Sequence, residues 1–194
     1  MQARESAAPA HRRRTVVVLL AGLAVLTGCV EIDGELAADG SLAFRYKYDP
    51  PPHATFKSET ARLASAHVRV EKIERDPAIV AGIPSEFAIA TLAVDDARQL
   101  PTSAAFARAQ VGLDLEKRTL RVTFPGVPAA GQEKVRNTPE ADRQALRLSL
   151  VFPGPVTEAT PSATIEGRRV TWVLTTRQYA ALGDPAVLTA SWNP

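Results

Sequence analysis

The chain has 194 residues, of which 45% are hydrophobic and 23% charged, and it contains a single Cys. This length suffices for one ordinary domain with a hydrophobic core, and one Cys excludes an intramolecular disulfide. The formal net charge of +2 is too small to favour nucleic acid as a partner, because that binding depends on neutralising phosphates.

The first 28 residues divide into a basic stretch, an apolar stretch and two small residues. Residues 1–14 carry four Arg, and residues 15–26 are apolar and uncharged. The apolar stretch is shorter than the ~20 residues that span a bilayer, but it matches the apolar region of a signal peptide. The run Leu26-Thr27-Gly28-Cys29 resembles the lipobox of bacterial lipoproteins. It predicts a signal peptide over 1–28, cleavage before Cys29 and lipid on its thiol. The alternatives are an ordinary secretory signal or an uncleaved anchor.

Cleavage at this point would change both the charge and the location of the protein. Residues 1–28 carry four Arg and one Glu, a net +3, so a chain beginning at Cys29 has a net charge of −1. One acyl chain binds a membrane only marginally, whereas several chains on one Cys give stable attachment. We therefore expect residues 29–194 to form one exported domain, lipid-anchored to the bacterial cell membrane or outer membrane and facing the periplasm or the cell exterior.

The segment from Glu31 to Asp49 predicts a β-hairpin. Asp39-Gly40 suits its tight turn, since Gly accepts the positive φ that such turns need. On the return strand, four apolar or aromatic residues alternate with Ala43, Arg45 and Lys47 and so share one face of the sheet. These four are Leu42, Phe44, Tyr46 and Tyr48.

Residues 54–109 predict a mixture of short helices and strands. The segment 54–67 is expected to be a helix with Phe56, Thr60, Leu63 and His67 on its apolar stripe. Further expected elements are strands over 68–74 and 86–94, a short helix that Asp95-Asp96 caps and that ends near Pro101, and a second short helix over 103–109.

The C-terminal half predicts mainly strands. The expected elements are a hairpin of 111–115 and 119–124, a long loop over 125–143 with one helical turn at Thr138-Pro139-Glu140, a strand over 145–152, a hairpin of 164–166 and 169–174, a helix over 176–182 and a strand over 186–191. The fold class is therefore α+β, with a mostly antiparallel, curved β-sheet and a few short helices after the cleaved signal peptide.

Two strands leave the sheet through the same tripeptide. Phe124-Pro125-Gly126 and Phe152-Pro153-Gly154 each follow an amphipathic strand. Proline ends strand pairing, and we expect each Gly to adopt a positive-φ corner. The repetition is explained either by two similar strand exits or by a duplicated unit, and we favour the first.

Two segments of the sequence resemble the LppM domain. Residues 148–156, LSLVFPGPV, and 165–172, IEGRRVTW, are similar to its strand exit and hairpin return, and Cys29-Val30-Glu31-Ile32 is similar to its start. The resemblance is strongest over 146–174. It implies a single LppM-like α+β domain over 29–194 and binding of a lipid or glycolipid at the cell envelope. Many members have a C-terminal transmembrane helix, whereas here the lipid on Cys29 is the one expected anchor.

The residues after Cys29 show no motif for catalysis, for a metal or for a cofactor. His53 and His67 have no second His or Cys at ligand spacing, and no G-x-S-x-G motif nominates a nucleophilic Ser. A hydrolase would need a polar cleft around one of these histidines. We therefore expect a protein that is not an enzyme, with no metal site, no catalytic residue and no cofactor.

An apolar ligand cavity is the remaining candidate site. Aromatic side chains commonly line such cavities, and the candidates are Phe44, Tyr46, Tyr48 and Trp172. The alternative is that they pack in the core. Six basic residues on or beside strands would contact lipid head groups or water. They are Arg45, Lys47, Arg121, Arg147, Arg168 and Arg169.

The predicted function is a membrane-anchored, non-enzymatic envelope lipoprotein that binds a lipid-like ligand. The alternative is an assembly lipoprotein that acts through an envelope protein partner.

Overall fold

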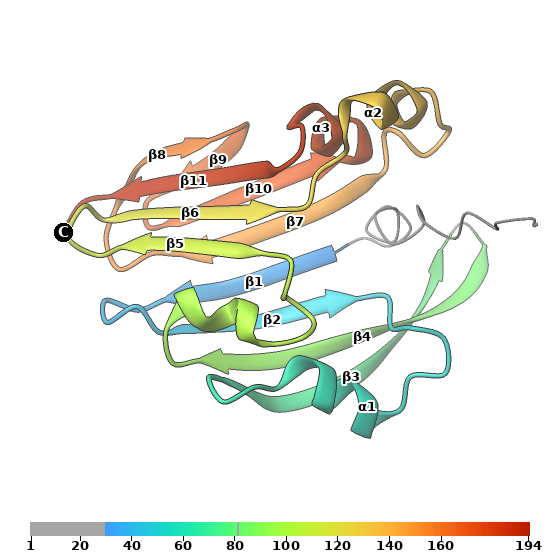
Figure 1. Ribbon diagram of the computed structural model, residues 1–194, viewed down its shortest axis with the longest axis horizontal. Helices are drawn as coiled ribbons and strands as arrows, with labels where there is room; N and C mark the ends of the chain where they lie inside the picture. Colours follow the sequence, from blue (N-terminus) through green and yellow to red (C-terminus); the bar gives the residue numbers. More distant parts are fainter. Residues whose placement is uncertain (1–29, 81) are drawn as a thin grey trace, which may run out of the picture.

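The computed structural model describes residues 30–80 and 82–194. The predicted signal peptide and lipobox, Leu26, Thr27, Gly28 and Cys29, lie outside the described residues. In the described part of the chain, eleven strands form two sheets that pack face to face, with short helices at the edges and at one end (Figure 1). The α+β fold class with mostly antiparallel strands and a few short helices is thus confirmed, and the strands are divided between two sheets.

The larger sheet has seven strands in the order β3, β4, β2, β1, β7, β10, β9. Among the described strands, β1 and β7 form the one parallel pair, and all other pairs are antiparallel. The bounds are Val30–Leu36 (β1), Leu42–Tyr48 (β2), Val68–Val80 (β3), Ile83–Val94 (β4), Gln144–Val151 (β7), Ala163–Glu166 (β9) and Arg169–Thr175 (β10).

The smaller sheet has four strands in the order β5, β6, β11, β8. The last strand of the chain, β11, is therefore central, and the β5–β6 hairpin lies on one side of it. The bounds are Gln110–Asp114 (β5), Thr119–Phe124 (β6), Val156–Thr160 (β8) and Ala186–Trp192 (β11). The helices are Phe56–Leu63 (α1), Ala129–Arg136 (α2) and Thr176–Ala181 (α3), with a 3-10 helix over Ala97–Thr102 (η2).

Alternation along the strands builds two cores. Even-numbered residues of β1, β7 and β10, together with Leu42 of β2, face the smaller sheet and form the main core with it. This core includes Phe152, Trp172 and Leu188. A second core lies between the larger sheet and α1, and it includes Leu63, Leu92 and Phe106. The sheet face that carries Asp33 and Arg147 is left uncovered by the described helices and by the smaller sheet (Figure 1).

The predicted hairpins, the strands over 145–152 and 186–191 and the helix over 176–182 are confirmed to within one or two residues, but β3 and β4 are much longer than expected. Pairing continues through Asp76–Phe87, Pro77–Glu86 and Ile79–Pro84, across residues that were expected to separate two shorter strands. Pro77 is tolerated because β3 is an edge strand. At Pro84, β4 has passed the end of its pairing with β2, so that strand also has a free edge there.

Several helix predictions were wrong. Helix α1 ends at Leu63, and its buried residues are Glu59 and Leu63, whereas Phe56 is 64% exposed and His67 lies outside the helix. Asp96 does cap the next element, but that element is a 3-10 helix that contains Pro101.

The segment 103–109 forms turns rather than a helix. The Ser103 hydroxyl and the Ala105 amide donate to the carbonyl of Arg62 and so fix the segment against α1. Helix α2 lies in the segment 125–143 that was expected to be a long loop, so that helix was not predicted. The segment from Thr138 forms hydrogen-bonded turns after α2, with the Ala141 amide donating to the Thr138 carbonyl. Strand β8 was not predicted.

The two Phe-Pro-Gly segments hold the two ends of β11. A Cβ on Gly126 would lie 1.7 Å from the carbonyl oxygen of Gly183, just before β11, and a Cβ on Gly154 would lie 1.9 Å from that of Asn193, just after it. Neither glycine has a positive φ, so the predicted positive-φ corners were wrong. Glycine is required because a second backbone passes too closely for a side chain. This shared requirement is sufficient reason for the repeated tripeptide.

Candidate functional site

An apolar cavity of about 50 Å³ lies between the two sheets. Its walls come from β1, β2 and β7 of the larger sheet, from β5 and β6 of the smaller sheet, and from the segment that joins β4 to β5. The lining residues are all apolar and are Ile32, Leu36, Leu42, Phe44, Ala97, Leu100, Phe106, Ala109, Val111, Leu120, Val122, Phe124, Leu148 and Leu150.

Local structure explains how the side chains reach the cavity. The cap of Asp96 on the Arg98 amide starts η2 and brings Leu100 over the sheet. The turn at 103–106 then places Phe106 edge-on against Phe44, with ring centroids 5.9 Å apart. The free space therefore lies where two sheets and a turn meet and where no single element fills the gap.

The size and the lining decide what the cavity can hold. A water molecule needs ~10–15 Å³ and two to four polar partners, and the lining offers no polar side chain. The cavity is therefore suited to an apolar group of a few carbons rather than to water. Leu100, Val111 and Phe124 are half-buried, so its wall reaches the surface beside β5.

A larger hollow of about 240 Å³ lies around Leu115, Arg118 and Trp192. Its lining mixes apolar side chains with a guanidinium and with backbone at the end of the chain. Water can satisfy these polar groups, so this hollow suits an apolar ligand less well than the cavity between the sheets.

The structure separates the four predicted cavity residues. Phe44 lines the cavity between the sheets. Tyr46 and Tyr48 stack on one another, with centroids 4.5 Å apart, and pack in the second core. Trp172 is buried in the main core, and its Nε1 donates to the carbonyl of Thr160 over 3.2 Å. Only Phe44 of the four therefore contacts the cavity.

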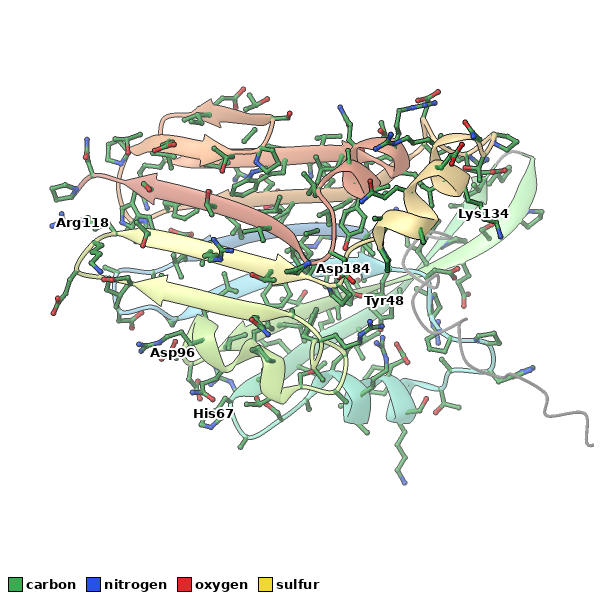
Figure 2. The ribbon with its side chains drawn as sticks, turned by 45° about the horizontal axis from the view of Figure 1, so that its top comes forward. Tyr48, His67, Asp96, Arg118, Lys134 and Asp184 are labelled. Atoms are coloured by element: carbon green, nitrogen blue, oxygen red, sulfur yellow. The ribbon has the colours of Figure 1, made fainter. Side chains whose placement is uncertain are left out.

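A buried charged cluster lies beside the tyrosines and fixes α1 on the sheet. The carboxylate of Glu59, with only 2% of the residue exposed, accepts from Tyr48 Oη at 2.5 Å and from two nitrogens of Arg62 at 2.8 and 3.2 Å. The Arg62 guanidinium also lies 4.9 Å from the centroid of the Tyr48 ring. Figure 2 shows Tyr48 in the interior of the molecule.

The surroundings of this cluster shift its pKa values in opposite directions. Burial acts to raise the pKa of Glu59, but the hydrogen bonds from Arg62 and Tyr48 outweigh it, so the pKa of the carboxyl is lowered. Burial raises the pKa of Tyr48, and its bond to Glu59 raises it further. Glu59 is thus favoured as the carboxylate and Tyr48 as the neutral phenol. These are the forms needed for an ion pair of Glu59 with Arg62 and a hydrogen bond from Tyr48 to Glu59.

The two histidines of the domain are exposed and lie beyond opposite ends of α1. His53 precedes the helix, and His67 follows it at the rim of the molecule (Figure 2). The polar cleft around a histidine that the hydrolase hypothesis needs is not seen in the described part of the chain. Within residues 30–80 and 82–194, no three His, Cys, Asp or Glu side chains are grouped to hold a metal ion.

Four of the six basic strand residues form ion pairs with neighbouring carboxylates. Arg147 and Arg169 both approach Asp33, at 3.9 and 3.1 Å. Arg168 pairs with Glu35 and Lys47 with Asp76, at 3.7 and 2.6 Å. This pairing favours the expectation of a solvated sheet face over a surface that collects anionic head groups.

The described residues contain no helix that is long and apolar enough to cross a membrane. No family model matches the chain, and no curated protein sequence matches it. Among solved structures, the NMR structure of the folded domain of LppM from Mycobacterium tuberculosis is similar, with a TM-score of 0.46 and 15% sequence identity. The match covers 86% of this chain and 91% of that chain. At these values, the function of the site has to be argued from its own residues.

Proposed function

We propose that the chain is a non-enzymatic envelope lipoprotein, anchored through lipid on Cys29, whose domain binds an apolar, lipid-like ligand between its two sheets. The observation that supports an apolar ligand is the wholly apolar cavity, whose lining includes Phe44 and Phe106. The lipobox supports the anchor. At about 50 Å³, the space takes the end of an acyl chain rather than a whole lipid.

A longer ligand would enter from the side of β5. This strand is at the edge of the smaller sheet, and the half-buried Val111 lies on it. The neighbouring segment 103–109 has no regular secondary structure and is held to α1 by the bonds of Ser103 and Ala105 to Arg62. Outward movement of this segment would widen the cavity without breaking the pairing within either sheet.

Filling the cavity is expected to abolish ligand binding. Ala109 lines the cavity, so Ala109→Leu would occupy it with three further carbons. We expect the protein extracted from membranes to show a noncovalently bound lipid by native mass spectrometry, in addition to the lipid on Cys29. The variant should retain at least about tenfold less of the bound lipid, which corresponds to a loss of about 1.4 kcal/mol in binding free energy. The matched control is Ala107→Leu, because Ala107 is exposed two residues away. A wild-type protein that carries no noncovalently bound lipid and binds no added fatty acid contradicts the proposed ligand.

Removing the thiol is expected to abolish the lipid anchor. Cys29→Ala leaves no acceptor for lipid, so the variant should carry no acyl chain while its domain remains folded. Mass spectrometry of the wild type should show a diacylglyceryl group on Cys29. If the wild type carries no lipid and keeps residues 15–26, that stretch is an uncleaved anchor and the lipoprotein proposal fails.

The alternative of an assembly lipoprotein requires an exposed apolar patch for a protein partner. The large apolar side chains that are exposed in the described residues are Phe56, Ile79, Val80, Ile165 and Val173. Of these, Ile79 and Val80 alone are adjacent, at the tip of the β3–β4 hairpin. The other three lie singly on α1, β9 and β10, as on ordinary protein surfaces.

A further inference from the structure

The β3–β4 hairpin extends well beyond the rest of the larger sheet (Figure 1). Glu31 of β1 is level with Lys47 of β2, which is level with Ile89 of β4. From Ile89, β4 continues back for six residues to Ile83, which is about 20 Å at roughly 3.3 Å per residue. The free end of the hairpin is therefore a projection with no neighbouring strand.

The free end is apolar and has a sharp charged boundary. We define the hairpin tip as residues 77–80 and 82–85, and no residue from 77 to 85 is charged. Ile79 is 78% exposed and Val80 is 38% exposed. The charges stop just below it, at Asp76, which pairs with Lys47, and at Glu86, which pairs with Arg75.

The hairpin tip projects from the end of the sheet at which β1 begins. Strand β1 starts at Val30, and its antiparallel neighbour β2 ends there at Tyr48 (Figure 1). The chain between Glu31 and Cys29 spans at most about 7 Å. A lipid on Cys29 would therefore hold the membrane surface within about 7 Å of the level of Glu31, whereas the hairpin tip reaches up to about 20 Å past that level.

The backbone of the hairpin tip suits lipid better than a protein strand. Ile79 is paired with Pro84 and Val80 with Ile83, so the tip pairs with itself. Pro77 and Pro84 have no N–H, which lowers the number of donors left at the edges. Unpaired donors are costly in lipid, and the same prolines discourage a further strand from joining the edge.

We propose that the hairpin tip enters the interfacial region of the membrane that holds Cys29, as a second, protein-based contact beside the lipid. This inference rests on the proposed lipid anchor. Interfacial elements bury their apolar face ~5–10 Å into the head-group boundary, which is within the reach of the projection. The contact would fix the orientation of the domain, so that its strands stand at an angle to the membrane instead of rotating freely about a single tether.

A fluorescent label at the tip tests the contact. Cys29 is the only Cys in the chain, so in the lipidated full-length protein Ile79→Cys supplies the one reactive thiol. It is labelled with the polarity-sensitive NBD group, and the protein is reconstituted into vesicles of phosphatidylethanolamine and phosphatidylglycerol. We expect the emission to shift to the blue, to be quenched by nitroxide-bearing lipid and to lose its quenching by aqueous iodide.

The matched control is Val173→Cys, a valine that is 46% exposed on the uncovered face of β10. Its label should stay in water, with full iodide quenching. If the label at residue 79 behaves like the label at residue 173 while mass spectrometry shows one labelled thiol and an acylated Cys29, the inference is wrong and the lipid anchor stands. Two labelled thiols would instead show that the anchor itself has failed. A blue shift in vesicles without quenching by nitroxide-bearing lipid would show that the residue-79 label is buried against protein and would overturn the inference.

Discussion

Gly154→Ala is expected to destabilise the domain by at least about 3 kcal/mol, as severe overpacking does. The new Cβ would lie 1.9 Å from the carbonyl oxygen of Asn193. That atom belongs to the backbone beside β11 and cannot move away by a change of rotamer. The amide of Asn193 donates to the Pro155 carbonyl over 2.8 Å, so relief would also strain this bond. Chemical unfolding followed by tryptophan fluorescence would measure the loss.

Gly126→Ala should have a similar effect at the other end of β11, where the Cβ would lie 1.7 Å from the carbonyl oxygen of Gly183. Gly112→Ala is the matched control, because its Cβ would meet its nearest neighbour at 3.7 Å, an ordinary contact. We expect the control to change the free energy of unfolding by less than about 1 kcal/mol. Equal stabilities of the Gly154→Ala and Gly112→Ala variants would show that the corner glycines do not hold β11.

Arg62→Leu is expected to cost about 3–5 kcal/mol at neutral pH, since it leaves the buried carboxylate of Glu59 without its cation. Glu59 would keep its bond to Tyr48 but lose both guanidinium bonds. The double variant Glu59→Leu and Arg62→Leu should recover part of the loss, because it removes the orphaned charge together with its partner. Urea unfolding at pH 7 would measure all three proteins.

An exposed ion pair and a pH series provide the controls. Arg177→Leu, which removes the exposed partner of Asp142, should cost less than about 1 kcal/mol. In the wild type the pKa of Glu59 is lowered from its ordinary value of 4.5. The ion pair therefore stabilises the fold above that pH and loses its contribution as the pH falls through the folded-state pKa. The difference between wild type and Arg62→Leu should shrink in acid, and a constant difference would show that Glu59 is not the cause.

Local patterns in the sequence predicted most strands correctly, because strand side chains alternate between two environments. The return strand from Leu42 to Tyr48 is an example. Strand β8 was missed because Thr157 and Glu158 break any such pattern, and its pairing partner β11 begins some thirty residues later. The segment 103–109 was expected to be a helix, but its conformation is set by bonds to Arg62. Where contacts between residues distant in the sequence determine the backbone conformation, local sequence alone predicts the wrong secondary structure.

The same limit applies to the candidate site. Alternation correctly placed Phe44, Tyr46 and Tyr48 on one face, but it could not show which element covers each side chain. The cavity adjoins Phe44, whereas the two tyrosines pack in the second core. The second wall, formed by Leu120, Val122 and Phe124, was visible as an apolar strand face without a partner. Recognising that this hairpin belongs to a separate sheet would have located the cavity.

The position of β1 in the larger sheet has a mechanical consequence for a protein tethered at Cys29. Strand β1 is flanked by β2 on one side and β7 on the other and is paired with each over six residues. A pull on the tether acts along this strand, and the hydrogen bonds on both sides lie across that direction. The force is therefore shared in shear by the two rows of hydrogen bonds that join β1 to β2 and to β7. These bonds resist together, whereas a pull at right angles to the strand would open them one at a time. The force that holds the domain at a membrane would pass directly into the middle of its larger sheet.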